Sequence, residues 1–109
     1  MMSGMKRVII ESPFAGDTER NIEYARKCLH HALMKNEAPV VSHLLYTQAG
    51  VLDDTIPSER ALGIEAGLVW GKEAELTVVY EDLGITEGMR LGIERAKKEG
   101  RPIEYRKIL

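Results

Sequence analysis

The 109-residue chain has one cysteine, Cys28, and no long apolar run. A single cysteine cannot form an internal disulfide, so we expect a domain that folds in a reducing cytoplasm. No apolar run approaches the roughly 20 residues that a membrane-spanning helix needs. The polar start of the chain also lacks the apolar core of a signal peptide. These absences predict a cytoplasmic protein with no membrane partner.

The sequence also lacks the signatures of several large functional classes. Its net charge of −2 comes without a basic block, which argues against a nucleic-acid partner. It contains no Gly-x-Gly-x-x-Gly fingerprint and no Walker lysine loop, so dinucleotide redox chemistry and NTP hydrolysis are not expected. His30 and His31 are adjacent and would point apart on a helix, and Cys28 has no second cysteine nearby. We therefore expect no metal and no cofactor.

What the sequence does contain is the composition of an ordinary globular domain. The hydrophobic share is 44% and the charged share 29%, which is enough apolar surface for one core. The length suits a single domain over residues 1–109 rather than two. We expect residues 1–5 to be disordered and to precede the first strand.

Predicted strands alternate with predicted helices along the whole chain. Strand-like runs lie at residues 7–10, 38–41, 76–80 and 102–106. Helical patterns follow the first three of them, with apolar stripes at residues 22, 25, 29, 32 and 33, at 62, 66 and 69, and at 89, 93 and 96. The alternation predicts an α/β fold, a small doubly wound parallel sheet of about four strands in the order 2-1-3-4, flavodoxin-like or Rossmann-like.

Two of the strand-to-helix junctions have the composition of ligand-binding turns. Residues 11–17 follow the first strand, and residues 82–89 follow the third and open the last helix at Thr86. A helix start presents free backbone N–H groups and a positive dipole end. In the order 2-1-3-4 the first and third strands are neighbours, so the two junctions would face each other across a crevice at the carboxyl ends of the strands.

At these residues the chain resembles the nucleoside 2-deoxyribosyltransferase-like superfamily, and more closely a branch of small domains common in phage and prophage genomes. The resemblance covers almost the whole chain and rests on the order of four segments: residues 11–14, 39–43, 52–60 and 82–89. It implies an oligomer that shapes the pocket and cleavage of an N-glycosidic bond by a glutamate nucleophile. The position that would carry this glutamate is Gly92, which has no carboxylate and cannot attack.

Two other carboxylates are therefore the candidates for catalysis, Glu11 and Asp82. They close neighbouring strands, and two carboxylates brought together there could share a proton. One of them would act as general base and water as nucleophile. Trp70 is expected at an oligomer interface. The expected ligand-binding residues come from both junctions and from the end of the second strand: Ser12, Pro13, Phe14, Asp17, His43, Asp82, Thr86, Glu87, Gly88 and Met89.

The function that these residues favour is binding of a nucleoside, nucleotide or related ribosyl ligand at the crevice. If the protein is an enzyme, the resemblance implies an N-glycosidase or deoxyribosyltransferase-like activity. Two alternatives stay open. One is a binding module that sequesters or senses a nucleotide without catalysis. The other is a homo-oligomer with a structural role and an unused crevice.

Overall fold

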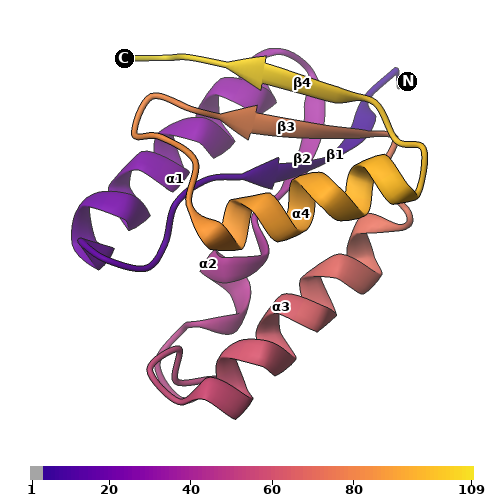
Figure 1. Cartoon of the computed structure of the whole chain (residues 1–109). Coiled ribbons are helices and arrows are strands. Elements are labelled where there is room, and N and C mark those ends of the chain that lie inside the picture. The colour runs from indigo at the N-terminus through magenta and orange to yellow at the C-terminus, as the bar shows by residue number, and fades with distance from the viewer. Residues whose placement is uncertain (1–3) are drawn as a thin grey trace.

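The computed structural model describes residues 4–109. Of the segment 1–5 that we expected to be disordered, residues 1–3 lie outside the described range. Four strands alternate with helices along the chain, as Figure 1 shows. Their bounds are β1 Lys6–Glu11, α1 Thr18–Met34, β2 Glu37–Val40, α2 Ser42–Tyr46, α3 Pro57–Gly71, β3 Leu76–Tyr80, α4 Glu87–Lys98 and β4 Ile103–Arg106. Within residues 4–109 no helix combines the length and hydropathy needed to cross a membrane.

The sheet has the topology that the sequence predicts. All its pairings are parallel and the strand order is β2-β1-β3-β4. In the centre, Val8 lies opposite Leu76 and Ile10 opposite Val78. The fold class is confirmed, and β1 and β3 end side by side at the same edge of the sheet.

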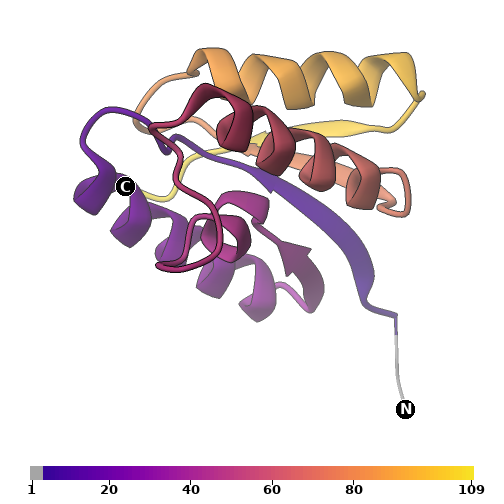
Figure 2. The same cartoon turned by 90° about the horizontal axis from the view of Figure 1, so that it is seen from below.

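Alternation of side chains along the strands builds two layers of core. Val8 and Ile10 of β1 and Val78 of β3 pack with the buried face of α1. The opposite face of β3 presents Val79 to a second cluster that contains Met89 and Ile93 of α4. Figure 2 shows α1 and α4 on opposite sides of the sheet. The side chain of Glu11, on the face opposite Val8 and Ile10, therefore points toward α4.

In α1 the predicted apolar stripe is largely confirmed, since Ala25 and Ala32 are buried and Leu29 packs against the core, but the buried face of α3 differs from its predicted stripe. In α1, Tyr24 and Cys28 are buried, whereas Leu33 is 47% exposed. In α3, Leu62 and Val69 are 61% and 51% exposed, and the buried residues are glycines.

The reason in α3 is close approach to the neighbouring short helix. A Cβ atom at Gly67 would lie 2.5 Å from the Ser42 Oγ atom of α2. The glycine side of α3 therefore faces the rest of the domain, because only glycine leaves room there. Leu62, Val69 and Trp70 are left on the outer side of the helix.

A buried ion pair ties the last strand to the second. The Arg106 guanidinium donates to both carboxylate oxygens of Glu37, at 2.6 and 2.9 Å, and to the Tyr80 hydroxyl at 3.0 Å. The pKa of Glu37 is lowered, chiefly by the hydrogen bonds from Arg106. Both side chains are largely buried, so each charge depends on the other for compensation.

We expect Glu37→Ala to destabilise the fold by about 3–5 kcal/mol, because it leaves the buried Arg106 charge without its main partner. Glu104→Ala is the control, since Glu104 also binds Arg106 but is half-exposed, and it should cost less than about 1 kcal/mol. Urea denaturation at pH 7 measures both. Equal effects of the two substitutions would contradict the assignment of the stabilising pair.

Candidate functional site

The two junctions meet in a cavity of about 170 Å³ at the carboxyl ends of β1 and β3. Its walls come from the turn after β1, from α2, from the inner side of α3 and from the start of α4. Eight of the residues expected from the sequence line it: Glu11, Ser12, Phe14, His43, Thr86, Glu87, Gly88 and Met89. Segments about seventy positions apart in the chain thus build one site.

Glu11 lies where β1 ends, and its carboxylate rests against α4 at Gly92. A Cβ atom at residue 92 would overlap the carboxylate oxygens of Glu11. The missing side chain on α4 is therefore what makes room for the acid on β1. Position 92, where the resemblance led us to look for a catalytic glutamate, is filled by a carboxylate that comes from another element.

Burial raises the pKa of Glu11 to about 8, and the positive charge of Arg101 opposes this shift only in part. Within residues 4–109 no hydrogen bond or ion pair to the carboxylate compensates for the lost hydration. At pH 7 the group is mainly protonated, so it can donate a proton into the cavity. This differs from the expected general base, which would need the ionised form.

Arg101 is a cavity residue that we did not predict. Its Nε atom donates to the Thr77 hydroxyl at 2.9 Å, and one terminal nitrogen donates to Glu99 at 2.7 Å. The side chain is only 6% exposed, so the guanidinium is held in a fixed position. The sequence signal was available but weak, because Arg101 follows Gly100 at the end of a helix and resembles an ordinary surface charge.

Ser12 and His43 form a hydrogen-bonded pair on another wall of the cavity. The Ser12 hydroxyl lies 3.1 Å from His43 Nε2, and the Phe14 ring packs on the imidazole with centroids 5.1 Å apart. Burial lowers the pKa of His43 to about 4, so the ring is neutral at pH 7. Its Nδ1 atom is buried and has no hydrogen-bond partner in the described part of the chain. No carboxylate there orients the ring, which sets the pair apart from a nucleophilic triad.

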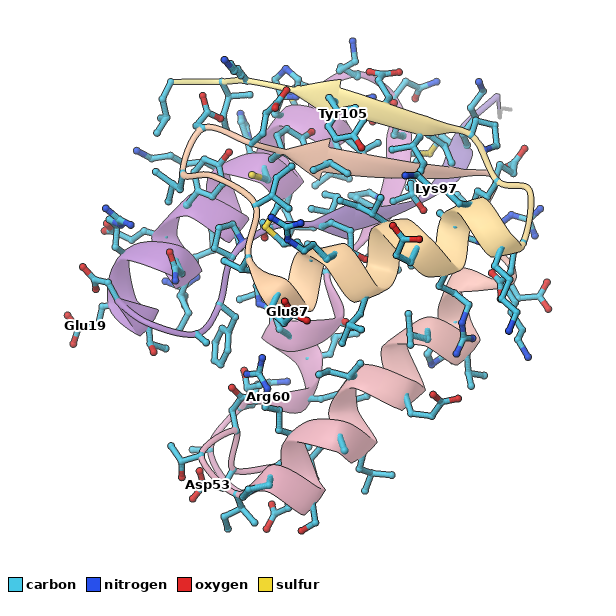
Figure 3. All side chains as sticks on the ribbon, in the orientation of Figure 1. Glu19, Asp53, Arg60, Glu87, Lys97 and Tyr105 are labelled. Carbon is cyan, nitrogen blue, oxygen red and sulfur yellow. The ribbon has the colours of Figure 1, made fainter. Side chains whose placement is uncertain are left out.

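The start of α4 forms the mouth of the cavity. The Thr86 hydroxyl accepts a hydrogen bond from the Met89 N–H at 3.3 Å and so caps the helix. Met89, one of the expected ligand-binding residues, therefore contributes a buried side chain to the cavity wall, and its N–H is bound by Thr86. Figure 3 shows Glu87 at this helix start, with Arg60 below it between α4 and α3.

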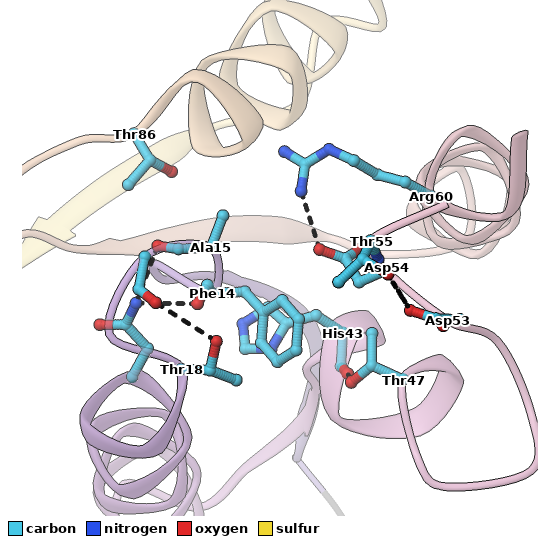
Figure 4. A network of polar contacts seen from close by, with 12 residues as sticks. Phe14, Ala15, Thr18, His43, Thr47, Asp53, Asp54, Thr55, Arg60 and Thr86 are labelled. Carbon is cyan, nitrogen blue, oxygen red and sulfur yellow. Dashed lines mark hydrogen bonds and ion pairs between the residues drawn. The ribbon is translucent and has the colours of Figure 1, made fainter. Parts of the chain in front are cut away.

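Arg60 of α3 stands between the cavity and a larger open basin. Its guanidinium binds the Asp54 carboxylate at 2.9 Å and lies beside Gly88 of α4. The basin has a volume of about 760 Å³ and shares Phe14, Asp54 and Arg60 with the inner cavity. Figure 4 shows Arg60 extending toward the start of α4, with Phe14 lying over His43. Arg60 and Asp54 were part of the resemblance but were not predicted as binding residues.

Three of the expected binding residues lie outside the cavity lining: Pro13, Asp17 and Asp82. Asp17 instead caps α1 by accepting from the Arg20 N–H at 3.3 Å. Pro13 stands between two lining residues without being one itself. Within residues 4–109 no group of three or more His, Cys, Asp or Glu side chains is placed to hold a metal ion.

Asp82 holds the end of the chain. Its carboxylate accepts from the Tyr24 hydroxyl at 2.6 Å and from the N–H groups of Ile108 and Leu109, each at 2.9 Å. Burial would raise the pKa of Asp82, but these donors outweigh it and the pKa is lowered. Asp82 is therefore an ionised structural anchor. It does not share a proton with Glu11, as we had expected it to do.

The sequence of residues 6–106 matches a protein family described as a domain of unknown function, DUF7768. The match spans every strand and helix of the fold. The chain belongs to this family. A comparison with curated proteins finds no match.

We expect Glu11→Gln to change how stability depends on pH. The pKa of Glu11 is higher in the folded chain, about 8, than its ordinary value of 4.5. The folded state then binds more protons than the unfolded state between these values, so the wild type loses stability as pH rises from 4.5 to 8. Glutamine cannot ionise, so Glu11→Gln should gain on the wild type across this window, by at most on the order of 4 kcal/mol.

Urea denaturation at pH 4.5, 6, 7 and 8.5 measures this difference. Glu94→Gln is the matched control, because it removes a carboxylate from the exposed side of α4 and should follow the wild-type profile. An offset between Glu11→Gln and the wild type that stays constant at all four pH values would show that folding does not raise the pKa of Glu11.

Proposed function

We propose that the cavity binds a nucleoside, a nucleotide or a related ribosyl ligand. The observation that carries the proposal is a mainly protonated carboxyl at the end of β1, in a cavity built from two strand-to-helix junctions at the topological switch point. Open α/β sheets bind their ligands at this position. The resemblance noted in the sequence adds the ribosyl chemistry.

The other cavity groups suit a ligand with a ring and several hydroxyls. Phe14 and His43 offer flat surfaces, and Ile64 and Leu68 add apolar wall. The Ser12 hydroxyl, Arg60 and the first turn of α4 add polar groups. An apolar pocket with a few convergent polar groups is the usual form of a small-molecule site.

Cleavage of the N-glycosidic bond is the second part of the proposal, and the position of Glu11 against Gly92 favours it. The protonated carboxyl donates its proton to a ring nitrogen of the base as the bond between the base and C1′ of the sugar breaks. Water then adds to C1′, and the proton that it releases returns to Glu11 through solvent. The products are the free base and the free sugar, with the enzyme unchanged. A covalent sugar–enzyme bond is not needed.

We expect the wild-type protein to release free base from at least one member of a panel of nucleosides and 5′-nucleotides. Glu11→Gln should lower that rate by about 10²–10⁴-fold, since it removes the general acid, while Glu94→Gln should leave it unchanged. Ligand at 100 times its dissociation constant should stabilise the fold by about 2.7 kcal/mol. Stabilisation by ligand without release of base would reduce the proposal to binding. The absence of both stabilisation and base release would contradict the proposal as a whole.

Moving the acid gives a second test. We expect Gly92→Ala to abolish base release in a folded protein, because the new Cβ atom displaces the flexible end of Glu11 rather than the backbone. In the double variant that carries Glu11→Ala and Gly92→Glu, α4 supplies the carboxylate in place of β1. We expect this variant to recover part of the activity that Glu11→Ala alone loses. Full activity in Gly92→Ala would contradict the placement of the acid.

A further inference from the structure

The inner end of the cavity presents two groups that both donate hydrogen bonds. One is the mainly protonated carboxyl of Glu11, which faces Gly92. The other is Nη2 of Arg101, which lies 3.5 Å from where a Cβ atom at Gly71 would be, next to Ile9. Within residues 4–109 Nη2 makes no hydrogen bond, although the other two nitrogens of the guanidinium are held by Thr77 and Glu99.

These two groups belong to one site but do not satisfy each other. They share the cavity and interact electrostatically, yet no ion pair between their side chains forms within residues 4–109. Arg101 is only 6% exposed and is anchored at two of its nitrogens, so the third nitrogen keeps free donors in a fixed position. A ligand group that accepts two hydrogen bonds at neighbouring atoms would satisfy both donors.

We infer that this inner end recognises the acceptor edge of a 6-oxopurine base, with Arg101 on the exocyclic oxygen and Glu11 on the adjacent ring nitrogen N7. The inference rests on the proposed function and names the class of base that it takes. Arginine is well suited to the O6 and N7 acceptors of guanine, and hypoxanthine presents the same pair. Adenine presents an amino donor in place of the oxygen, and that donor would face Arg101.

The volumes agree with a ligand divided between two compartments. The inner cavity of about 170 Å³ is smaller than the roughly 300–1,000 Å³ of typical ligand pockets. It therefore suits the base alone. The basin of about 760 Å³ beyond Phe14 and Arg60 would take the remainder of the ligand.

The inference also places the proton where the proposed cleavage needs it. Protonation of N7 draws electrons from the ring and weakens the bond between N9 and C1′. The glycosidic electron pair then remains on the departing base, which leaves as the neutral, protonated purine. The same carboxyl would thus recognise the base and act as the general acid.

The test compares inosine with adenosine, which differ at the exocyclic group of the six-membered ring. Binding is measured by calorimetry with the wild type, Arg101→Lys and Thr77→Val. We expect the wild type to bind inosine about 10- to 100-fold more tightly than adenosine. Arg101→Lys keeps the charge but loses the fixed fork, and Thr77→Val removes its anchor, so both should reduce this ratio.

Each outcome separates the inference from the function on which it rests. Equal or tighter binding of adenosine by the wild type would overturn the base assignment and leave ribosyl binding intact. Failure of both nucleosides and of their 5′-phosphates to bind would remove the proposed function as well. Displacement of inosine by inorganic phosphate alone would show that the two donors hold a phosphate, and would overturn the inference. Because Thr77→Val is nearly isosteric, it keeps the test valid if Arg101→Lys does not fold.

Discussion

The contact between Glu11 and Gly92 is the constraint on which the site depends. Strand alternation sends Val8 and Ile10 into the core beneath α1 and turns Glu11 toward α4. There the carboxyl has space only because residue 92 has no side chain. A larger residue would move the acid, and with it the group of the cavity whose pKa burial raises to about 8.

Close packing at glycines also shapes the rest of the cavity. Gly67 and Gly71 line α3 where it meets α2, Ile9 and Arg101, so three helices approach one another around a small volume. The cost is an outer face of α3 that leaves Leu62, Val69 and Trp70 exposed. Packing in α3 is thus organised around the cavity rather than around the largest apolar side chains.

The polar side chains of the domain divide into two groups with different roles. Glu37, Arg106, Tyr24 and Asp82 satisfy one another or the chain end, and their charges are compensated. In the cavity, His43 Nδ1 is buried without a partner, and within residues 4–109 neither the Glu11 carboxyl nor Arg101 Nη2 makes a hydrogen bond. Uncompensated groups in a shared cavity are the usual mark of a functional site, because a structural role would have paired them.

Part of the site was predictable because it depends on local sequence and on topology. Alternation of strands and helices indicated the order 2-1-3-4, and this order brought the turn after Glu11 to the start of α4. Thr86 could be recognised as a cap from its position before the helix. Asp82 could not be separated from Glu11 by sequence, since both follow a strand. Only the path of the chain end, which donates Ile108 N–H to Asp82, decides between an anchor and a cavity acid.

The amino-acid sequence by itself determined the sheet, its order and the edge at which a ligand would bind, because these follow from periodicity and from the handedness of parallel connections. Tertiary structure alone decided which face of α3 is buried, which carboxylate fills the space at Gly92, and that Arg101 turns inward. These depend on distances of a few ångströms between distant segments. Hydrophobic pattern cannot encode them, since a glycine, a helix-end arginine and a strand-end glutamate each look ordinary until they are packed together.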